Sequence, residues 1–590
     1  MNFQSPIYTE KTQCQDCYKC IRECPVKAIR VERGHAMVVS ELCVFCGHCV
    51  LACPAGAKRV RDDLSRARQL LTLKGKAILS LAPSFASEFA GIDPADLAAA
   101  IRALGFFGVS ETAIGADLVS ARLAADFRAV GADGDGDKKP GRTLFLSSAC
   151  PSAVEFVKQY MPELAGNLTD RASPLLAHAR FLRETYGDDI GIVFAGPCVA
   201  KKREADAWPD IDCAISFSDL RAWFASSGVE PAPGLARNAA GDGPADGFIP
   251  WRAASGSYYP VDGGMIASIK RSSLKSDVRM MTVSGLPEIR NALSGLSEEA
   301  LDRPLFMELL ACPGGCVNGP LVSPGHSSAL RRVRLLEYAE TAPDGSGDAR
   351  KAGPDMTGTL PKKPTFPTSH TDEEIRNALR SAGKVTARDE LNCGSCGYDT
   401  CRAFAAAMLD ARAEKTMCLS YMRKLAQKKA NGLIRAMPSG VVICDSALKI
   451  VECNENFARL MGEDILSMYE AKPGMEGADL AAITGLAAFC ADAIARDGPD
   501  VSEHEFRERR KIYQATVFSI EKGESACAVV QDVTAPQVRR DRVIRQTKKV
   551  IDKNLAVVQK IAYLLGENAA ETEATLNSII ESFSAGEGEP

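Results

Sequence analysis

Aromatic residues and histidine are scarce in this sequence. Phe, Trp and Tyr make up 6% of the 590 residues, and only 3 Trp and 6 His occur. Neither sign of charge dominates, since 71 Lys and Arg face 75 Asp and Glu and leave a formal net charge of -4. The absence of a basic excess argues against nucleic acid or an anionic membrane surface as a partner.

Long apolar runs are also absent. No stretch approaches the roughly 20 apolar residues that span a bilayer, and the segment MNFQSPIYTEKTQCQD lacks the basic start and apolar core of a signal peptide. We therefore expect a soluble, cytoplasmic protein with no membrane segment. A chain of 590 residues is too long for one hydrophobic core and predicts roughly three to five domains.

Cysteine, in contrast, is abundant, with 21 residues. In a reducing compartment, so many thiols favour metal or redox chemistry over disulfides. Two runs near the N-terminus share the spacing C-x2-C-x2-C-x3-C-P, in which three thiolates bind one cluster and the fourth crosses to the other. The spacing predicts two 4Fe-4S clusters, one held by Cys14, Cys17, Cys20 and Cys53 and the other by Cys43, Cys46, Cys49 and Cys24.

This duplicated unit resembles a bacterial two-cluster ferredoxin over roughly the first 60 residues. The strand-like segments AIRVERG and AMVVSE lie between its halves. A pair of zinc knuckles is the alternative, but zinc sites do not require the repeated Cys-Pro.

Four further cysteines follow apolar, strand-like runs. TLFLSSACP ends at Cys150, DIGIVFAGPC at Cys198, and LFMELLACPGGC at Cys312 and Cys316. Sites in parallel α/β sheets form where the carboxyl ends of strands converge, so we expect these thiols to meet at one sheet edge and hold a cluster. The alternative for a single cysteine such as Cys150 is a small buried hydrophobe.

These three segments resemble, in order, the three H-cluster motifs of FeFe hydrogenases. SSACP matches T-S-C-C-P, GPCVAKKRE matches M-P-C-x-x-K-x-x-E, and ELLACPGGC matches E-x-M-A-C-x-x-G-C. The resemblance spans roughly residues 76–335, with LAPS, ETAIGADL and the pair Ser173-Pro174 in the expected order. It implies that Cys150, Cys198, Cys312 and Cys316 bind a 4Fe-4S cube.

The resemblance also implies a di-iron site with CO, cyanide and dithiolate ligands, bridged to the cube by Cys316. Lys201 aligns with the family lysine that hydrogen-bonds one cyanide, and Ala82 and Pro83 align with the segment beside the other cyanide. The pair Gly314-Gly315 is expected to let the backbone approach this bulky cofactor closely.

One position departs from the family in a way that affects chemistry. Ala149 stands where standard hydrogenases carry the cysteine that passes protons to and from the dithiolate amine, and alanine can neither donate nor accept a proton. An alignment without gaps also puts Leu123 and Asp126 at two glutamates of the family's proton path. Further replacements of family methionines and a glutamine are Gly196, Leu310 and Leu175.

The retained ligands and the lost proton relay predict slow H2 turnover, as in the sensory branch of the family. The alternative is a substitute relay through Ser148, Thr169 or water.

Two more units follow. Residues 341–374, rich in Gly, Pro and charge, are predicted to be a linker. LNCGSCGYDTC and KTMC then resemble a small 4Fe-4S domain of electron-transfer proteins, with zinc as the alternative. Its predicted ligands have gaps of two, four and sixteen residues and are Cys393, Cys396, Cys401 and Cys418.

Residues 431–537 resemble a PAS domain, from LIRAMPSGVVICDSALKIVECNENF at its entry to a closing hairpin in ATVFSIEKGESACAVVQDV. His504 is expected on a surface helix or strand rather than as a haem ligand, and the sequence assigns no PAS ligand. Four cysteines without metal-ligand spacing are predicted to be small buried hydrophobes, namely Cys444, Cys453, Cys490 and Cys527.

The tail, residues 538–590, has alternating apolar gaps of four and three, which predict a coiled coil and a homodimer. A helix packed on the PAS domain is the alternative. The seam positions are Ile544, Ile551, Leu555, Val558, Ala562, Leu565, Ala569, Thr572, Leu576, Ile579 and Phe583.

The sequence thus predicts a multidomain α/β and α+β chain: a two-cluster ferredoxin domain (1–70), an α/β H-cluster domain (71–340), the linker, a small 4Fe-4S domain (375–430), a PAS domain and a C-terminal helix. We expect three 4Fe-4S clusters plus the H-cluster in a low-activity hydrogenase that senses H2. The expected partners are H2, ferredoxin or another electron-transfer protein, and a kinase or phosphatase system. The alternatives are an ordinary ferredoxin-dependent hydrogenase and a non-enzymatic iron–sulfur carrier or assembly factor.

Overall fold

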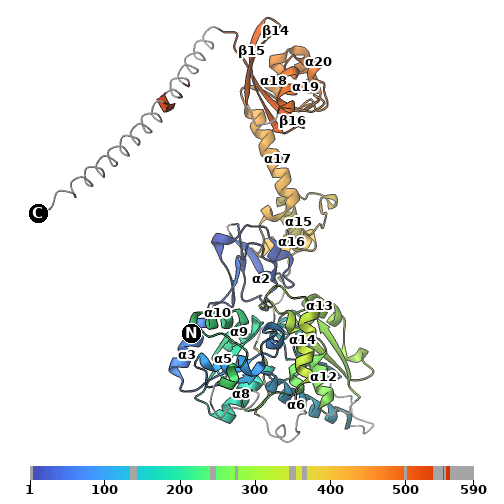
Figure 1. The fold of residues 1–590 in the computed structure, drawn as a ribbon. Coiled ribbons are helices and arrows are strands. Elements are labelled where there is room, and N and C mark those ends of the chain that lie inside the picture. Colours follow the sequence, from blue (N-terminus) through green and yellow to red (C-terminus); the bar gives the residue numbers. More distant parts are fainter. Residues whose placement is uncertain are drawn as a thin grey trace, which may run out of the picture. The chain divides into compact units, whose positions relative to one another are not determined.

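The structure, a computed structural model, describes residues 4–32, 34–132, 143–238, 247–272, 277–343, 354–361, 364, 368–496, 501–535, 549, 553 and 555–557. The chain forms two compact units, Met1–Met422 and Arg423–Pro590, and passes from one to the other within helix α17 (Leu419–Ala436) (Figure 1). No helix among the described residues is long and apolar enough to cross a membrane.

The N-terminal region, residues 4–63, is built from two short antiparallel strand pairs. β1 (Ile7–Thr9) pairs with β4 (Lys58–Val60), and β2 (Ile29–Glu32) pairs with β3 (His35–Val38). β2 and β3 lie in the two segments predicted to be strands. The short helices α1 (Lys19–Arg22) and α2 (His48–Ala52) each carry the third cysteine of a run. The β1–β4 pair joins the two ends of this region.

The central region, residues 64–343, contains two parallel sheets. The first has the order β6 (Gly108–Glu111), β5 (Ala77–Leu81), β8 (Gly191–Ala195), β9 (Cys213–Ile215). The second has the order β10 (Arg279–Ser284), β11 (Leu305–Leu310), β7 (Leu144–Leu146). Every residue of β5, β6 and β8 is buried, as expected for parallel strands that are covered on both faces.

One expectation about these strands was wrong. Cys150 follows β7 and Cys312 follows β11 in the second sheet, but Cys198 follows β8 in the first. The cysteines therefore follow the carboxyl ends of strands in two sheets and do not share one sheet edge. The local pattern places each cysteine after a strand, but it carries no information on which strands pair across the chain.

Some helices of the central region begin at a residue whose side chain caps the helix. The Asp93 carboxylate accepts a hydrogen bond from the Ala95 N–H, and the Ser173 hydroxyl accepts one from the Leu176 N–H, each before a proline at the first helical position. The helices are α3 (Leu64–Leu73), α4 (Phe85–Glu88), α5 (Pro94–Ala103), α6 (Ala113–Ala132), α7 (Pro151–Tyr160), α8 (Pro174–Tyr186), α9 (Ala200–Ala207), α10 (Phe217–Ser227), α11 (Leu235–Asn238), α12 (Gly264–Arg271), α13 (Leu286–Leu293) and α14 (Ser328–Glu340). Short 3-10 helices are η1 (Lys11–Gln13), η2 (Pro162–Asn167), η3 (Ser255–Tyr258), η4 (Glu298–Ala300), η5 (Cys316–Asn318), η6 (Ala387–Asp389) and η7 (Lys415–Met417).

Part of the predicted linker packs on the central region. The Met356 carbonyl accepts a hydrogen bond of 2.7 Å from the Ala172 N–H, and the side chains of Met356 and Leu360 are buried. Arg180 also donates to the carbonyls of Asp355 and Thr357. Two apolar anchors therefore order a stretch whose overall composition is typical of a loop.

The small region, residues 368–422, packs on the N-terminal region. It contains α15 (Asp372–Ser381), which begins with a capping box between Thr371 and Glu374, and α16 (Cys401–Leu409). The Val31 N–H donates to the Arg412 carbonyl over 3.2 Å. Gly397, with φ +93°, approaches Ile21 so closely that an added Cβ would lie 2.7 Å from its Cγ2.

The second unit contains a five-stranded antiparallel sheet in the order β13 (Ile450–Cys453), β12 (Gly440–Asp445), β16 (Ser525–Asp532), β15 (Lys511–Glu521), β14 (Ser502–Glu508) (Figure 1). The strands and closing hairpin predicted for a PAS domain are present. Four helices join β13 to β14, namely α18 (Glu455–Met461), α19 (Glu463–Ala471), α20 (Leu480–Ile483) and α21 (Ala487–Ala495).

Cys444, Cys453, Cys490 and Cys527 are all buried in this unit, as predicted. His504 lies on β14 and stacks on Phe489 with 4.2 Å between ring centroids. Of the predicted heptad positions, Leu555 is helical and 52% exposed, and the others lie outside the described residues.

Candidate functional site

Two adjoining cavities bring the four strand-end cysteines together. The smaller, of about 360 Å³, is lined by Cys150, Cys198, Cys312 and Cys316. The larger, of about 690 Å³, shares Cys150, Cys198 and Cys316 and extends away from them. Three cysteines therefore line both spaces, together with Pro197 and Leu310.

The local backbone explains how each thiol reaches the cavities. Cys150 is the residue before α7, where Pro151 starts the helix. Gly314 and Gly315 have φ values of 73° and 99° in the turn before Cys316, and a Cβ on Gly315 would lie 2.3 Å from the Pro260 carbonyl oxygen. Neither glycine is among the described residues that line the cavities. The structure therefore gives the pair a role in the conformation of the turn. Its close approach to a cofactor stays a prediction.

The electrostatics of the thiols favour a bound cation. Burial raises the pKa of Cys198 to about 11, the neighbouring Cys150 raises this pKa further, and Lys201 lowers it. Burial and then neighbouring cysteines also raise the pKa of Cys312 and of Cys316. Burial and neighbouring cysteines thus oppose the ionisation of Cys198, Cys312 and Cys316, and a bound metal would compensate the charges of their thiolates.

Lys201 lies on α9 at the wall of the larger cavity. Its ammonium donates to the Glu204 carboxylate over 2.6 Å and to the Ser173 hydroxyl over 3.0 Å. Ala82 and Pro83 line the same cavity. The structure thus brings together Lys201 and the LAPS segment, as the sequence predicts.

Ser84, the last residue of LAPS, was missed by the sequence reasoning. Its hydroxyl is buried, lines the larger cavity and has no hydrogen-bond partner among the described residues. A buried donor without an acceptor is costly, so this hydroxyl fits a bound group that carries an acceptor. The neighbouring Ala82 and Pro83 were the signal that could have pointed to it.

Ala149 lines the larger cavity and contributes only a methyl group there. Leu123 is buried in the core, and the Asp126 carboxylate accepts a hydrogen bond of 2.8 Å from Arg171. The Ser148 hydroxyl lies 2.9 Å from the Thr169 hydroxyl and 2.6 Å from the Arg171 carbonyl, its acceptor. Neither Ser148 nor Thr169 is among the described residues that line the cavity, so a relay through them would need a further group.

Apart from the thiols and Lys201, the polar side chains that line this cavity are those of Ser84, Thr112 and Tyr259. Thr112 hydrogen-bonds Ser80 over 2.7 Å, and Ser80 hydrogen-bonds His178 over 2.8 Å. Burial lowers the pKa of His178 to about 3, so this imidazole is neutral at pH 7. The Tyr259 hydroxyl lies 2.8 Å from the Ser120 hydroxyl.

Comparison with known families identifies this region. The model described as iron only hydrogenase large subunit, C-terminal domain, matches residues 75–320. Residues 75–320 form an iron-only hydrogenase domain. Three further family models match other parts of the chain: a 4Fe-4S dicluster domain at residues 13–58, a putative Fe-S cluster at residues 389–420 and a PAS domain at residues 429–498.

Several curated hydrogenases are similar to this chain. The NADP-reducing hydrogenase subunit HndD of Solidesulfovibrio fructosivorans is 25% identical over 413 residues, which cover 58% of this chain and 69% of the relative. Iron hydrogenase 1 of Clostridium pasteurianum is 24% identical over 328 residues, and the chain spans about half of that relative's length, 55%. A solved variant of the FeFe hydrogenase HydA1 from Chlamydomonas reinhardtii, 18% identical, matches 48% of this chain and 91% of its own with a TM-score of 0.37.

The N-terminal cysteines adjoin the hydrogenase domain. Cys43, Cys46, Cys49 and Cys24 line one cavity of about 310 Å³, so the fourth cysteine of the first run lies with the second run. Cys46 also lines the 360 Å³ cavity of the hydrogenase domain. Cys20 has Cys53, Cys14 and Cys17 as charged neighbours, and burial raises its pKa to about 11.

The small region gathers three of its four predicted ligands. Burial raises the pKa of Cys396, with Cys418 and Cys401 as neighbours that raise it further. Cys393 is exposed and its thiol lies 3.5 Å from the Ser395 hydroxyl. These thiol sets lie within the residues that match the three iron–sulfur family models.

Proposed function

We propose that this chain converts H2 reversibly to protons and electrons at low turnover, and that its purpose is to report H2 or redox state. The cofactor would be an H-cluster, with its cube held by Cys150, Cys198, Cys312 and Cys316 in the smaller cavity and its di-iron part in the larger. When bound, the di-iron group with CO, cyanide and dithiolate ligands supplies the H2 chemistry. Four thiols around one cavity and the unpaired Ser84 hydroxyl beside it support this assignment.

The observation that carries the proposal of low turnover is Ala149. It lines the cavity at the position where the family carries its proton-transferring cysteine, and a methyl group cannot move a proton. Lys201 and Ser84 would bind and orient the cyanide ligands as hydrogen-bond donors. The apolar lining, which includes Leu175 and Leu310, excludes water from the reacting face.

The appended units support a reporting role. The N-terminal and small regions would hold three 4Fe-4S clusters and exchange electrons with ferredoxin or another electron-transfer protein. The PAS domain and C-terminal helix would pass the redox state to a kinase or phosphatase system. We place this chemistry in the cytoplasm, because a chain with 21 cysteines and no predicted disulfide fits a reducing compartment.

The test is the infrared spectrum and H2 turnover of fully matured protein under anaerobiosis. Bands of CO and cyanide with slow turnover are expected. A chain that holds iron and sulfide but gives no such bands would be an iron–sulfur carrier or assembly factor. Bands together with turnover as fast as that of standard hydrogenases would make it an ordinary hydrogenase with another proton path.

A further inference from the structure

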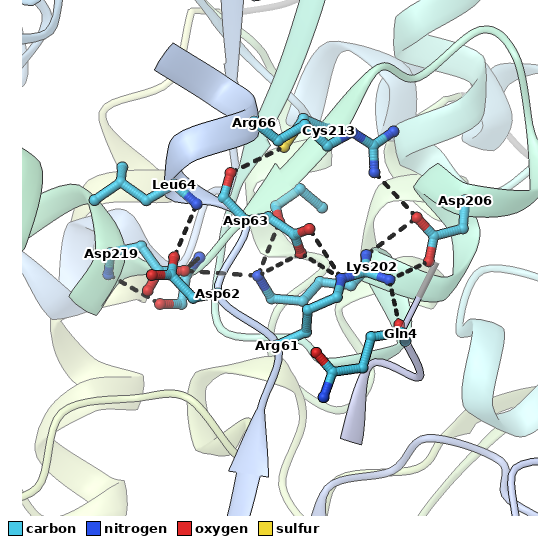
Figure 2. Close-up of polar contacts among 12 residues, drawn as sticks. Gln4, Arg61, Asp62, Asp63, Leu64, Arg66, Lys202, Asp206, Cys213 and Asp219 are labelled. Atoms are coloured by element: carbon cyan, nitrogen blue, oxygen red, sulfur yellow. Dashed lines mark hydrogen bonds and ion pairs between the residues drawn. The ribbon is translucent and has the colours of Figure 1, made fainter. Parts of the chain in front are cut away.

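A buried ion cluster holds helix α9 on contacts separate from the cavity (Figure 2). The Lys202 ammonium donates to the Asp63 carboxylate and to the Ala214 carbonyl, each over 3.0 Å. Arg61 donates to Asp63 over 2.9 Å and binds Asp206 through two hydrogen bonds of 2.8 and 3.0 Å. Among the described residues, those that line the two cavities include none of these four.

The cluster joins two parts of the chain. Arg61 and Asp63 lie in the segment between β4, the last strand of the N-terminal region, and α3, the first helix that follows it. Lys202 lies in the first turn of α9 and Asp206 in its last turn. The connecting segment therefore binds α9 at both ends.

Burial makes these ion pairs costly to break. The side chains of Lys202 and Asp63 are 1% and 5% exposed. In the whole cluster three cations face three anions, since Arg66 also pairs with Asp206 and Lys202 also lies 3.6 Å from the Asp219 carboxylate. Removing one partner of a buried pair leaves an uncompensated charge away from water, which is far costlier than losing a surface pair. The helix is therefore held in one position relative to the segment.

The other contacts of α9 reach the active site. Lys201, the residue next to Lys202, lines the larger cavity and donates to Ser173. Cys198, two residues before α9, lines both cavities. A shift of α9 would move both residues together.

We propose that Lys202 is a positioning residue of the hydrogenase site. Through Asp63 it holds α9 against the connecting segment, so that the docking of the N-terminal region fixes where Lys201 and Cys198 stand. The role of Lys201 as a cofactor-binding residue rests on the proposed function. The attachment of α9 to the connecting segment through Lys202 and Asp63 does not.

The first experiment uses the full chain without clusters. In Lys202→Met, the backbone amides of α9 should exchange hydrogen at least about 100-fold faster than in the unchanged chain, because the buried cluster loses a cation, Asp63 keeps only Arg61 as its partner, and the contact between Asp63 and the first turn of α9 is gone. The matched control is Lys74→Met, which removes the same group from a surface pair with Asp189, and it should leave exchange in α9 unchanged. Equal exchange in the two variants overturns the proposal.

The second experiment reads the site itself. In matured Lys202→Met protein, the infrared bands of cyanide should shift or broaden, whereas Lys74→Met should match the unchanged chain. Faster exchange in α9 with unshifted cyanide bands would show that Lys202 only stabilises the helix. This result would overturn the proposal that Lys202 positions the site. Faster exchange in a chain that forms no cyanide bands at all would instead refute the proposed function and leave the coupling standing.

Asp63→Asn is the milder variant for the case in which Lys202→Met does not fold. It keeps the shape of the side chain and an oxygen acceptor, and Arg61 retains Asp206. The exchange of α9 should rise by about tenfold, since a neutral acceptor replaces a charged one. No rise in this folded variant contradicts the coupling.

Discussion

Cys46 of the N-terminal region and Cys312 of the hydrogenase domain line the same cavity of about 360 Å³. Cys46 also lines the cavity that it shares with Cys24, Cys43 and Cys49. It is thus common to two cysteine-lined spaces in regions that are separate in the sequence. This contact places the thiols of the N-terminal region directly beside those of the hydrogenase domain.

Each cysteine-to-serine change should therefore remove the cofactor signal of its own site only, although the cavities adjoin. Cys316→Ser should abolish the CO and cyanide bands and keep the EPR signals of the N-terminal clusters, because Cys316 does not line their cavity. Cys20→Ser should instead keep the CO and cyanide bands and remove the EPR signal of its own cluster, because Cys20 is not among the described residues that line the hydrogenase cavities. A full H-cluster spectrum in Cys316→Ser would contradict the assignment of ligands.

The sequence predicted these thiol sets because ligand spacing within a run is a local property. The capped helix starts and the strands before each cysteine are local as well. The division of β7, β8 and β11 between two sheets depends on pairings between distant segments, so the sequence pattern could not reveal it. For the same reason the contact between Asp63 and Lys202 was not foreseen.

Composition does not indicate where the predicted linker packs. Residues 341–374 are rich in Gly, Pro and charge, yet Met356 and Leu360 are buried against the hydrogenase domain. These two side chains, the backbone hydrogen bond to Ala172 and the hydrogen bonds from Arg180 hold residues 354–361 on that domain. Single anchors of this kind give no periodic signal, because they repeat at no fixed interval.

Glu111 gives a prediction for the pH dependence of stability. Burial raises its pKa from 4.5 to about 7, although hydrogen bonds from Tyr338 and the Ala253 N–H oppose the rise. The folded chain therefore keeps this proton up to about pH 7, whereas the unfolded chain releases it near pH 4.5. The contribution of Glu111 to the free energy of unfolding falls as pH rises through this window, by about 3 kcal/mol in total, and is constant above it.

Glu111→Gln should remove this contribution, because glutamine does not titrate. The thermal unfolding midpoint of the hydrogenase domain, measured from pH 5 to 8, should fall less with rising pH in the variant than in the unchanged chain. Parallel curves for the two proteins would show that Glu111 is ionised in the folded state.

Asn454 should be a stability determinant of the PAS domain. It is fully buried, and its side-chain oxygen accepts hydrogen bonds from the N–H groups of Val441 and Phe457. Its amide nitrogen donates to the carbonyls of Ile434 and Ser439. Asn454→Ala leaves several buried backbone groups unpaired, at a cost of about 2–4 kcal/mol.

Hydrogen exchange of β12 in the full chain measures this loss. Asn456→Ala is the matched control, because Asn456 is only partly buried and donates one hydrogen bond, to the Met437 carbonyl. The control should change exchange in β12 by less than about twofold. Similar exchange in both variants would refute the structural role of Asn454.

Ala149→Cys should increase activity. The new thiol would stand at the cavity wall, where it can donate and accept the proton that alanine cannot, and a positioned acid or base contributes about 100-fold or more to rate. The rise should be smaller than this, because Leu123 is apolar and buried and Asp126 is already paired with Arg171, so the next members of the path are missing. Ala149→Ser is the control, since a hydroxyl is similar in size but holds its proton too tightly to act as an acid near pH 7. The measurement is H2 turnover per H-cluster, with cluster content fixed by the infrared bands. Equal turnover in all three proteins would show that proton transfer at Ala149 does not limit the rate, and a fast rate in the unchanged chain would remove the argument for a sensor.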